Sequence, residues 1–331
     1  MIEIKPNIYQ LQIPIDNNPL GHTNTYLIRD NGGYLLIDAG WDSEEALQAM
    51  KDQLSEIGTD LDKIKRIVVT HVHGDHYGLV HTLKNYTDAE IIIHRREKEV
   101  LLNRYTTVYA TMSDIEESWT RNGAPQNELP MPDLPARDTQ RLQTPVIPDS
   151  TVEGGEILTA GDYNLQVIWT PGHAPGHICL YESTSKILFG GDHVLPVITP
   201  NISLLPYAGD NPLGEFMDSL KTLDELDVEI VLPAHDSIYY DLHKRIAEIT
   251  NHHHQRNLEI MDSITEGPKT AYQISSAITW IPESGGIKYE DLPPMHKRMA
   301  MLETLAHLKA MLVDGEVKYF TEDGIDYYEI S

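Results

Sequence analysis

The order of apolar and polar positions predicts β-structure over the first forty residues. Two short apolar runs, at 24–30 and 33–38, flank the segment Asp30-Asn31-Gly32-Gly33. An Asn-Gly dipeptide between two such runs is a strong signal for a tight hairpin. We therefore predict that the two runs pair as antiparallel strands.

Strands and helices are predicted to alternate over the next fifty residues. A helix should begin with Asp42 as its N-cap and end at Gly58, because apolar residues between them recur every three to four positions. A buried strand at 67–70, a helix over about 77–86 and a strand at 91–93 follow. This rhythm is typical of a β-α-β unit.

The middle of the chain departs from this rhythm. Residues 95–123 have a helical pattern, whereas 124–150 contain six prolines and no clear periodicity. A long proline-rich stretch inside a compact domain is usually functional or mobile. We predict that 100–150 is an insertion that covers a site like a lid.

The β-rhythm returns after residue 150. Strands are predicted at 164–170, 177–182, 186–190 and 229–232, with a helix over about 212–226. Two blocks of strands, each followed by helices, favour an α+β fold in which two sheets pack together and helices cover their outer faces.

The chain becomes mostly helical after about residue 240. A last long helix should end near Gly315, and two short strands, 316–320 and 326–330, should form a terminal hairpin. We therefore predict two domains, a main domain over 1–240 and a small, helical, winged-helix-like domain over 241–331.

Composition narrows the class of protein. The 331 residues include 51 acidic and 25 basic side chains, for a formal net charge of −26, which disfavours nucleic acid and anionic membranes as partners. The single cysteine, Cys179, excludes an internal disulfide and a zinc site built on several thiolates. The first residues lack the features of a signal peptide, and no apolar run approaches the roughly 20 residues of a membrane span. We expect a soluble, cytoplasmic protein.

Metal-binding side chains are concentrated directly after the predicted strand at 67–70. Four of them lie within six residues: His71, His73, Asp75 and His76. Imidazole and carboxylate ligands suit zinc, iron or manganese. One metal ion does not need four ligands from one loop, so the motif favours two adjacent metal ions that take further ligands from elsewhere.

Similar side chains follow three other predicted strands. His173 comes after Thr170-Pro171-Gly172, Asp192 after Gly190-Gly191, and His235 after Pro233-Ala234. Sheet edges that build a site present ligands in this way, directly beyond the strand ends.

These seven positions resemble the metallo-β-lactamase superfamily, in its glyoxalase-II-like branch. The His-x-His-x-Asp-His pattern is matched at 71–76, and the further family positions are matched in order, over about residues 7–240. The resemblance implies an αββα sandwich with two divalent metal ions. It implies that His71, His73 and His173 hold one ion, that Asp75, His76 and His235 hold the other, and that Asp192 bridges them. Zinc is the first expectation, with iron and manganese as alternatives.

Two such metal ions can hold a bridging hydroxide as the nucleophile at neutral pH. Asp75 is expected to act in catalysis as well, by orienting the hydroxide or passing its proton to the leaving group. The net charge leads us to expect a small ester, thioester or lactone as the substrate. A phosphodiesterase or ribonuclease with the same metals is the alternative enzyme, and a metal-holding binding or regulatory protein with little turnover is the alternative class.

The tail resembles the winged-helix-like end of a bacterial branch of such hydrolases. Its residues from 241 onward include 9 basic and 15 acidic side chains, a net charge of −6. DNA binding is therefore disfavoured, and we expect the tail to form a homodimer or to cover the site.

Several polar residues near the motifs have alternative roles. Asp38 is a candidate acceptor for a ligand histidine, or else a turn cap. His177 is expected to support the ligands without binding metal, and packing is preferred over substrate contact for His193 and Tyr77. The run 252–254 contains three consecutive histidines, which point in different directions on a helix and cannot converge on one metal ion.

Overall fold

A computed structural model describes residues 1–16, 18–106, 116–125, 146–281 and 285–331. The first sheet has seven strands in sequence order, antiparallel from β1 to β4 and parallel from β4 to β7. Its strands are β1 (Ile2–Lys5), β2 (Ile8–Pro14), β3 (His22–Asp30), β4 (Gly33–Ile37), β5 (Ile64–Val68), β6 (Glu90–His94) and β7 (Ser150–Val152).

The second sheet has five strands in the order β12-β11-β10-β9-β8, and only β11 and β12 run parallel. These strands are β8 (Ile157–Ala160), β9 (Tyr163–Trp169), β10 (Ile178–Glu182), β11 (Ile187–Gly191) and β12 (Ile230–Pro233). The positions of β9 to β12 agree with the strands predicted from the sequence to within two residues, whereas β8 was not predicted.

Apolar side chains of both sheets share one buried core. Tyr26 and Ile37 from the first sheet pack with Leu180 and Phe189 from the second, and the rings of Tyr26 and Phe189 meet edge to face, 5.4 Å apart. Because each strand turns alternate side chains to opposite faces, the outer faces need helices to cover them. The predicted α+β arrangement of two packed sheets with outer helices is therefore confirmed.

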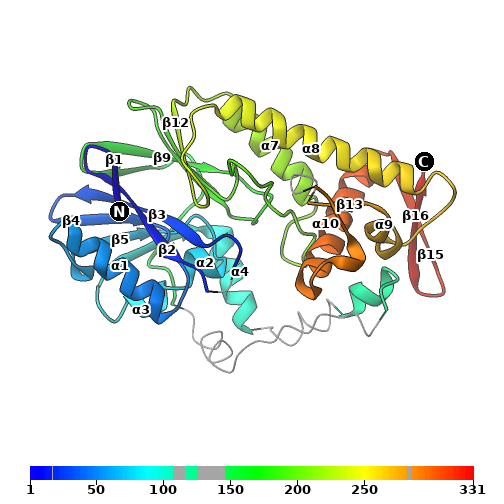
Figure 1. Cartoon of the computed structure of the whole chain (residues 1–331), viewed down its shortest axis with the longest axis horizontal. Coiled ribbons are helices and arrows are strands. Elements are labelled where there is room, and N and C mark those ends of the chain that lie inside the picture. Colours follow the sequence, from blue (N-terminus) through cyan, green and yellow to red (C-terminus); the bar gives the residue numbers. More distant parts are fainter. Residues whose placement is uncertain (17, 107–115, 126–145, 282–284) are drawn as a thin grey trace.

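Helices cover the outer face of each sheet. On the first sheet these are α1 (Glu44–Glu56), α3 (Val80–Leu83) and the start of α4 (Arg95–Thr106). On the second sheet they are α7 (Pro212–Asp224) and α8 (Leu242–Ser263). Figure 1 shows α8 running from the sheets toward the C-terminal part.

Two local predictions were wrong in detail. The N-cap of α1 is Ser43, not Asp42, and its hydroxyl accepts a hydrogen bond from the Ala46 amide. The helix expected over 77–86 is two short helices, α2 (Gly74–Tyr77) and α3. Of the helical stretch expected over 95–123, α4 ends at Thr106 and a further helical turn spans 116–121. Most of the predicted insertion, at 107–115 and 126–145, lies outside the described residues.

The C-terminal part contains α9 (Ala271–Ala277), α10 (Pro294–Val313) and two small hairpins. The hairpins pair β13 (Thr279–Trp280) with β14 (Ile287–Lys288), and β15 (Val317–Glu322) with β16 (Ile325–Ile330). The terminal hairpin was predicted, whereas the winged-helix resemblance stays a prediction. Ala306 and Ala310 of α10 pack in the same core as Phe216 of α7, so the tail contacts the main part directly, and the division at residue 240 also stays a prediction.

No helix among the described residues is both long enough and apolar enough to cross a lipid bilayer.

Candidate metal centre

The predicted ligands meet where four strands end. The loop after β5 carries the 71–76 motif, and the loops after β9, β11 and β12 carry the remaining three positions. Backbone hydrogen bonds join these loops to the neighbouring sheet, because the Ile178 amide donates to the Thr70 carbonyl (3.0 Å) and the Asn24 amide to the Ala234 carbonyl (2.7 Å). The architecture therefore brings together side chains that lie far apart in the sequence.

Four of the seven side chains form one cluster. His73 Nδ1 lies 2.8 Å from His71 Nε2 and 3.0 Å from His173 Nε2. Asp192 Oδ2 lies 3.6 Å from His173 Nε2 and 3.9 Å from His71 Nε2. All four ligand atoms lie within 4.8 Å of one another, which is the spacing of donors around one ion.

The other three side chains form a second cluster beside the first. His235 Nε2 lies 3.2 Å from Asp75 Oδ2, and His76 Nε2 lies 3.7 Å from the same oxygen. Asp192 faces this cluster too, because its Oδ2 is 3.3 Å from His76 Nε2 and its Oδ1 is 3.4 Å from His235 Nε2. Asp192 thus stands between the two clusters, where the sequence resemblance placed a bridging ligand.

The chemistry of these donors fits a pair of divalent cations. His76 Nε2, His235 Nε2 and Asp192 Oδ1 are buried, and none has a well-aligned hydrogen-bond partner among the described residues. Buried polar atoms normally find partners. A metal ion at each cluster would satisfy these atoms.

The protonation states differ between the clusters. Although burial opposes it, the neighbouring carboxylates, Asp192 above all, raise the pKa of His76 well above its ordinary value and that of His235 to about 10, so a cation must displace protons from these two rings to bind. Burial opposes ionisation of Asp192, but the neighbouring His76 and His235 hold its pKa well below the ordinary value. Burial raises the pKa of Asp75 as well, but its neighbours, mainly His76, lower it to about 2. Burial lowers the pKa of His71 well below 6.5, so this imidazole is neutral and its lone pair is free to bind a metal.

Hydrogen bonds fix the orientation of the ligand rings. His173 Nδ1 donates to the Asn201 carbonyl (2.9 Å) and His235 Nδ1 donates to the His22 carbonyl (3.1 Å). Each bond turns the ring so that Nε2 faces the clusters. Such outer contacts typically contribute 10–100-fold to metal affinity.

Asp38 takes the first of its two predicted roles, as an acceptor for a ligand histidine in the loop after β5. Its Oδ2 lies 2.9 Å from His76 Nδ1, and its Oδ1 accepts a hydrogen bond from the Thr70 amide at 2.7 Å. Thr70 Oγ1 in turn lies 3.1 Å from His71 Nδ1. One buried carboxylate therefore positions histidines of both clusters.

Comparison with known families agrees with this geometry. A family model described as the metallo-beta-lactamase superfamily matches residues 18–235. The chain belongs to this superfamily. The match ends at His235, the last predicted ligand, and it covers both sheets except for β1 and β2.

Relatives of known name are metallo-hydrolases. A probable metallo-hydrolase of Bacillus subtilis, YqjP, is 26% identical over 94% of this chain and 94% of its own length. The chicken (Gallus gallus) acyl-coenzyme A thioesterase MBLAC2 is 31% identical over 65% of this chain and 73% of its own length. A metallo-beta-lactamase family protein of Thermus thermophilus, TTHA1429, superposes with a TM-score of 0.83 at 27% identity, covering 99% of this chain and 100% of that one. The chain is therefore a metallo-β-lactamase-fold hydrolase with His/Asp clusters suited to metal.

The other histidines near the site take structural roles. His177 Nε2 accepts a hydrogen bond from the Asp192 amide (3.1 Å), so its Nδ1 carries the proton and donates to Thr170 Oγ1 (2.8 Å). Gly191 lies at φ +51°, and a Cβ there would come within 2.5 Å of His177 Nε2, so a side chain would break this contact. His193 is fully buried against Phe216, and burial lowers its pKa to about 3. These positions agree with the supporting and packing roles predicted for both histidines.

The remaining candidates also pack rather than react. Tyr77 donates its hydroxyl proton to the Val146 carbonyl at 2.5 Å. In α8, His253 is buried, His252 is half-buried and His254 is exposed, as expected of three consecutive helical residues. Cys179 is buried in β10, where burial raises the pKa of its thiol to about 12.

One supporting residue was missed by the sequence analysis. Glu97 of α4 is buried, and its Oε2 accepts a hydrogen bond from the Val72 amide while its Oε1 accepts one from the Gly176 amide, both at 2.8 Å. The carboxylate thus joins the loop of the 71–76 motif to the loop that holds His173. In the sequence Glu97 has the form of an ordinary acidic residue in the first turn of a helix, so no pattern could have singled it out.

Replacing Glu97 with alanine should destabilise the protein and loosen the metal clusters. Each buried N–H that loses its acceptor costs about 1–3 kcal/mol, so we expect the free energy of unfolding to fall by roughly 2–5 kcal/mol. Urea denaturation measures the loss of stability, and metal analysis after dialysis should show reduced retention.

Glu99→Ala is the matched control, since Glu99 lies on the same helix and its side chain contacts, among the described residues, only Arg95, in an exposed ion pair of 2.8 Å. Such pairs contribute about 0–1 kcal/mol. If both variants unfold at the same urea concentration, Glu97 does not join the two loops in solution.

Proposed function

We propose that the protein is a dinuclear metal hydrolase of small esters, with thioesters as its preferred substrates. The observation that carries this proposal is the placement of Asp192 between two ligand clusters, with one oxygen within 3.6 Å of both His173 and His76. A single-ion site would not need a shared carboxylate. Three further side chains would hold each ion: His71, His73 and His173 the first, and Asp75, His76 and His235 the second.

When bound, such a metal pair supplies a water molecule of lowered pKa and a Lewis acid for the substrate carbonyl. The protein's own side chains hold the metal ligands in a fixed geometry and transfer the proton. Asp38, Asn201 and Glu97 hold the ligand loops, so the donors keep one geometry through the reaction. Asp75 is ionised because its pKa is about 2, and its Oδ2 is the atom that we expect to take the proton of the attacking water and return it to the leaving group.

Two observations support a small thioester over RNA. The net charge of −26 repels polyanions such as RNA. The related MBLAC2 proteins of chicken and human are named acyl-coenzyme A thioesterases, at 31% and 30% identity. We take zinc as the metal because histidine and carboxylate ligands suit it.

A panel of substrates tests the proposal on metal-loaded protein. We expect kcat/KM for acetyl and decanoyl thioesters to exceed that for bis-p-nitrophenyl phosphate by at least about tenfold, which corresponds to 1.4 kcal/mol in the barrier. Turnover of the phosphodiester or of RNA alone would show that the ester assignment is wrong. Stoichiometric metal without turnover of any substrate would favour a metal-holding binding protein. His73→Ala, measured in parallel, controls for contaminating hydrolases.

A further inference from the structure

An apolar cavity lies where the 204–206 segment, which follows a loop of the metal centre, meets α10 of the C-terminal part. Its volume is about 290 Å³, and most of its wall comes from α10, from the 204–206 segment and from the helical turn at 116–121. The apolar side chains that form the wall are Trp119, Leu204, Leu205, Met301, Leu302 and Leu305. Neither the sequence motifs nor the named relatives give this cavity a role.

One short segment of the chain both orients the ligand His173 and lines the cavity. The Asn201 carbonyl accepts the hydrogen bond from His173 Nδ1, and Leu204, three residues later, lines the cavity. Three residues span at most about 11 Å. The Leu204 amide donates to the Leu302 carbonyl of α10 at 3.1 Å. The cavity therefore begins within a short reach of the ligand His173.

A second bond ties α10 to the same loop. Asn201 Nδ2 donates to Glu303 Oε2 at 2.7 Å, and Glu303 follows Leu302 of the cavity wall. One helix thus holds the loop of the metal centre with a polar residue and lines the cavity with its apolar neighbours.

One buried polar group in the wall is not satisfied by the protein. Trp119 is 2% exposed, and its indole Nε1 has no hydrogen-bond partner among the described residues. Buried donors are rarely left without an acceptor.

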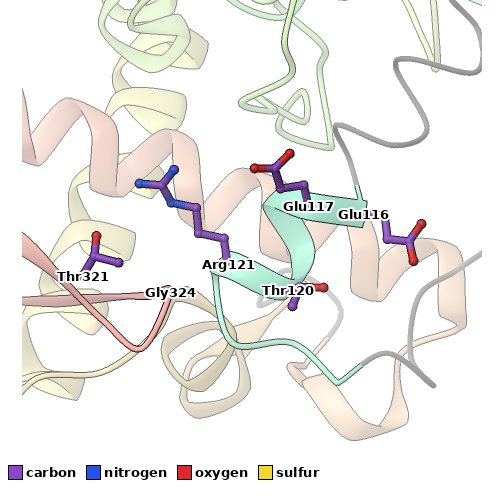
Figure 2. A pocket seen from close by; sticks show the side chains of 6 residues that line it. All are labelled: Glu116, Glu117, Thr120, Arg121, Thr321 and Gly324. Atoms are coloured by element: carbon purple, nitrogen blue, oxygen red, sulfur yellow. The ribbon is translucent and has the colours of Figure 1, made fainter.

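The opposite side of the same helical turn faces a different, polar pocket. Figure 2 shows Glu117 and Arg121 pointing to the same side of this turn. That pocket is larger, about 630 Å³, but Arg121 is already paired with Asp326 at 2.7 Å. None of its lining residues is bonded to the ligand loops, so it offers no route to the clusters.

We propose that the apolar cavity binds the acyl chain of the substrate, which rests on the proposed function as an ester hydrolase. Its volume lies at the lower end of the roughly 300–1,000 Å³ found for whole small-molecule sites. It therefore suits one apolar part of a substrate whose carbonyl lies at the clusters. Each buried methylene should raise affinity roughly fourfold, so the enzyme should prefer medium-length chains over acetyl.

Chain-length dependence in two variants tests the cavity. Leu205→Trp fills it, and we expect kcat/KM for a decanoyl thioester to fall at least tenfold while that for acetyl thioester stays within twofold. Unchanged acetyl turnover also shows that the variant is folded. Leu258→Trp, at a 50% exposed leucine of α8, is the control and should change neither value. Equal loss on both substrates, or full decanoyl activity in the folded Leu205→Trp variant, would overturn the proposal.

Binding of decanoate, the expected product, separates the two proposals. By isothermal titration, decanoate should bind the metal-loaded wild type at least tenfold more tightly than Leu205→Trp, and acetate should not distinguish them. If no ester is hydrolysed and this difference persists, the proposed function fails and the acyl-chain cavity stands. If thioesters are hydrolysed without chain-length preference and decanoate binds both proteins equally, the cavity proposal fails and the function stands.

Discussion

Asp192→Ala should lower kcat/KM on the best ester substrate by on the order of 100- to 1,000-fold, the scale seen when one preorganised polar contact is removed from an active site. The reason is its position, because its two oxygens lie within 3.3–3.6 Å of His76, His173 and His235. Alanine leaves both clusters one ligand short. Metal analysis should show less than the wild-type content per chain, and steady-state kinetics measures the loss of activity.

Asp218→Ala provides the control for this experiment. Asp218 lies on α7, is largely exposed and, within the part of the chain that the structure describes, forms an ion pair only with Lys221, at 2.8 Å. Its replacement should leave kinetics and metal content at wild-type values. Wild-type activity in Asp192→Ala would refute the bridging role, and full metal content with lost activity would assign Asp192 to the reaction rather than to metal retention.

Removal of metal should cost both activity and stability. Chelation would leave the ionised carboxylates of Asp75 and Asp192 balanced only by the protons that His76 and His235 take up. A ligand present at 100 times its Kd stabilises a folded protein by about 2.7 kcal/mol, and we expect Tm to fall by roughly 5–10 °C. Calorimetry before and after chelation, followed by addition of zinc, measures the effect and its reversal.

The Asp192→Ala variant distinguishes metal loss from a direct effect of the chelator. Because its clusters are already incomplete, chelation should change its Tm by less than half of the wild-type shift. An equal shift in both proteins would place the stabilising metal elsewhere. No Tm change in the wild type would mean that the clusters hold no metal that matters for folding.

The residues of the candidate site were predictable from the sequence because they follow strands. A short apolar run that ends in a small residue and then a ligand-type side chain marks a sheet edge, and such edges meet in space. His71, His173 and Asp192 each have this local signature, as does His235. The two sheets were predictable for the same reason, since alternating or continuous apolar runs depend on neighbours close in the chain.

The supporting contacts were not predictable, because they join segments far apart in the sequence. Glu97 bonds to an amide 79 residues away, and Asn201 bonds to Glu303 across 102 residues. Neither side chain has a local pattern that distinguishes it from a surface residue. The N-cap of α1 could not be predicted from the sequence either, because aspartate and serine are both good N-caps. The backbone geometry places Ser43, not Asp42, at that position.

The bond between Asn201 and Glu303 also sets an order of events during synthesis. The loop that orients His173 is translated 102 residues before its partner on α10. At roughly 5–20 residues per second, this loop waits about 5–20 s for its final hydrogen bond. The growing chain therefore presents its histidines to the cell's metal pool while one of them is still incompletely held, and the mature geometry is reached only when the last helix has been made.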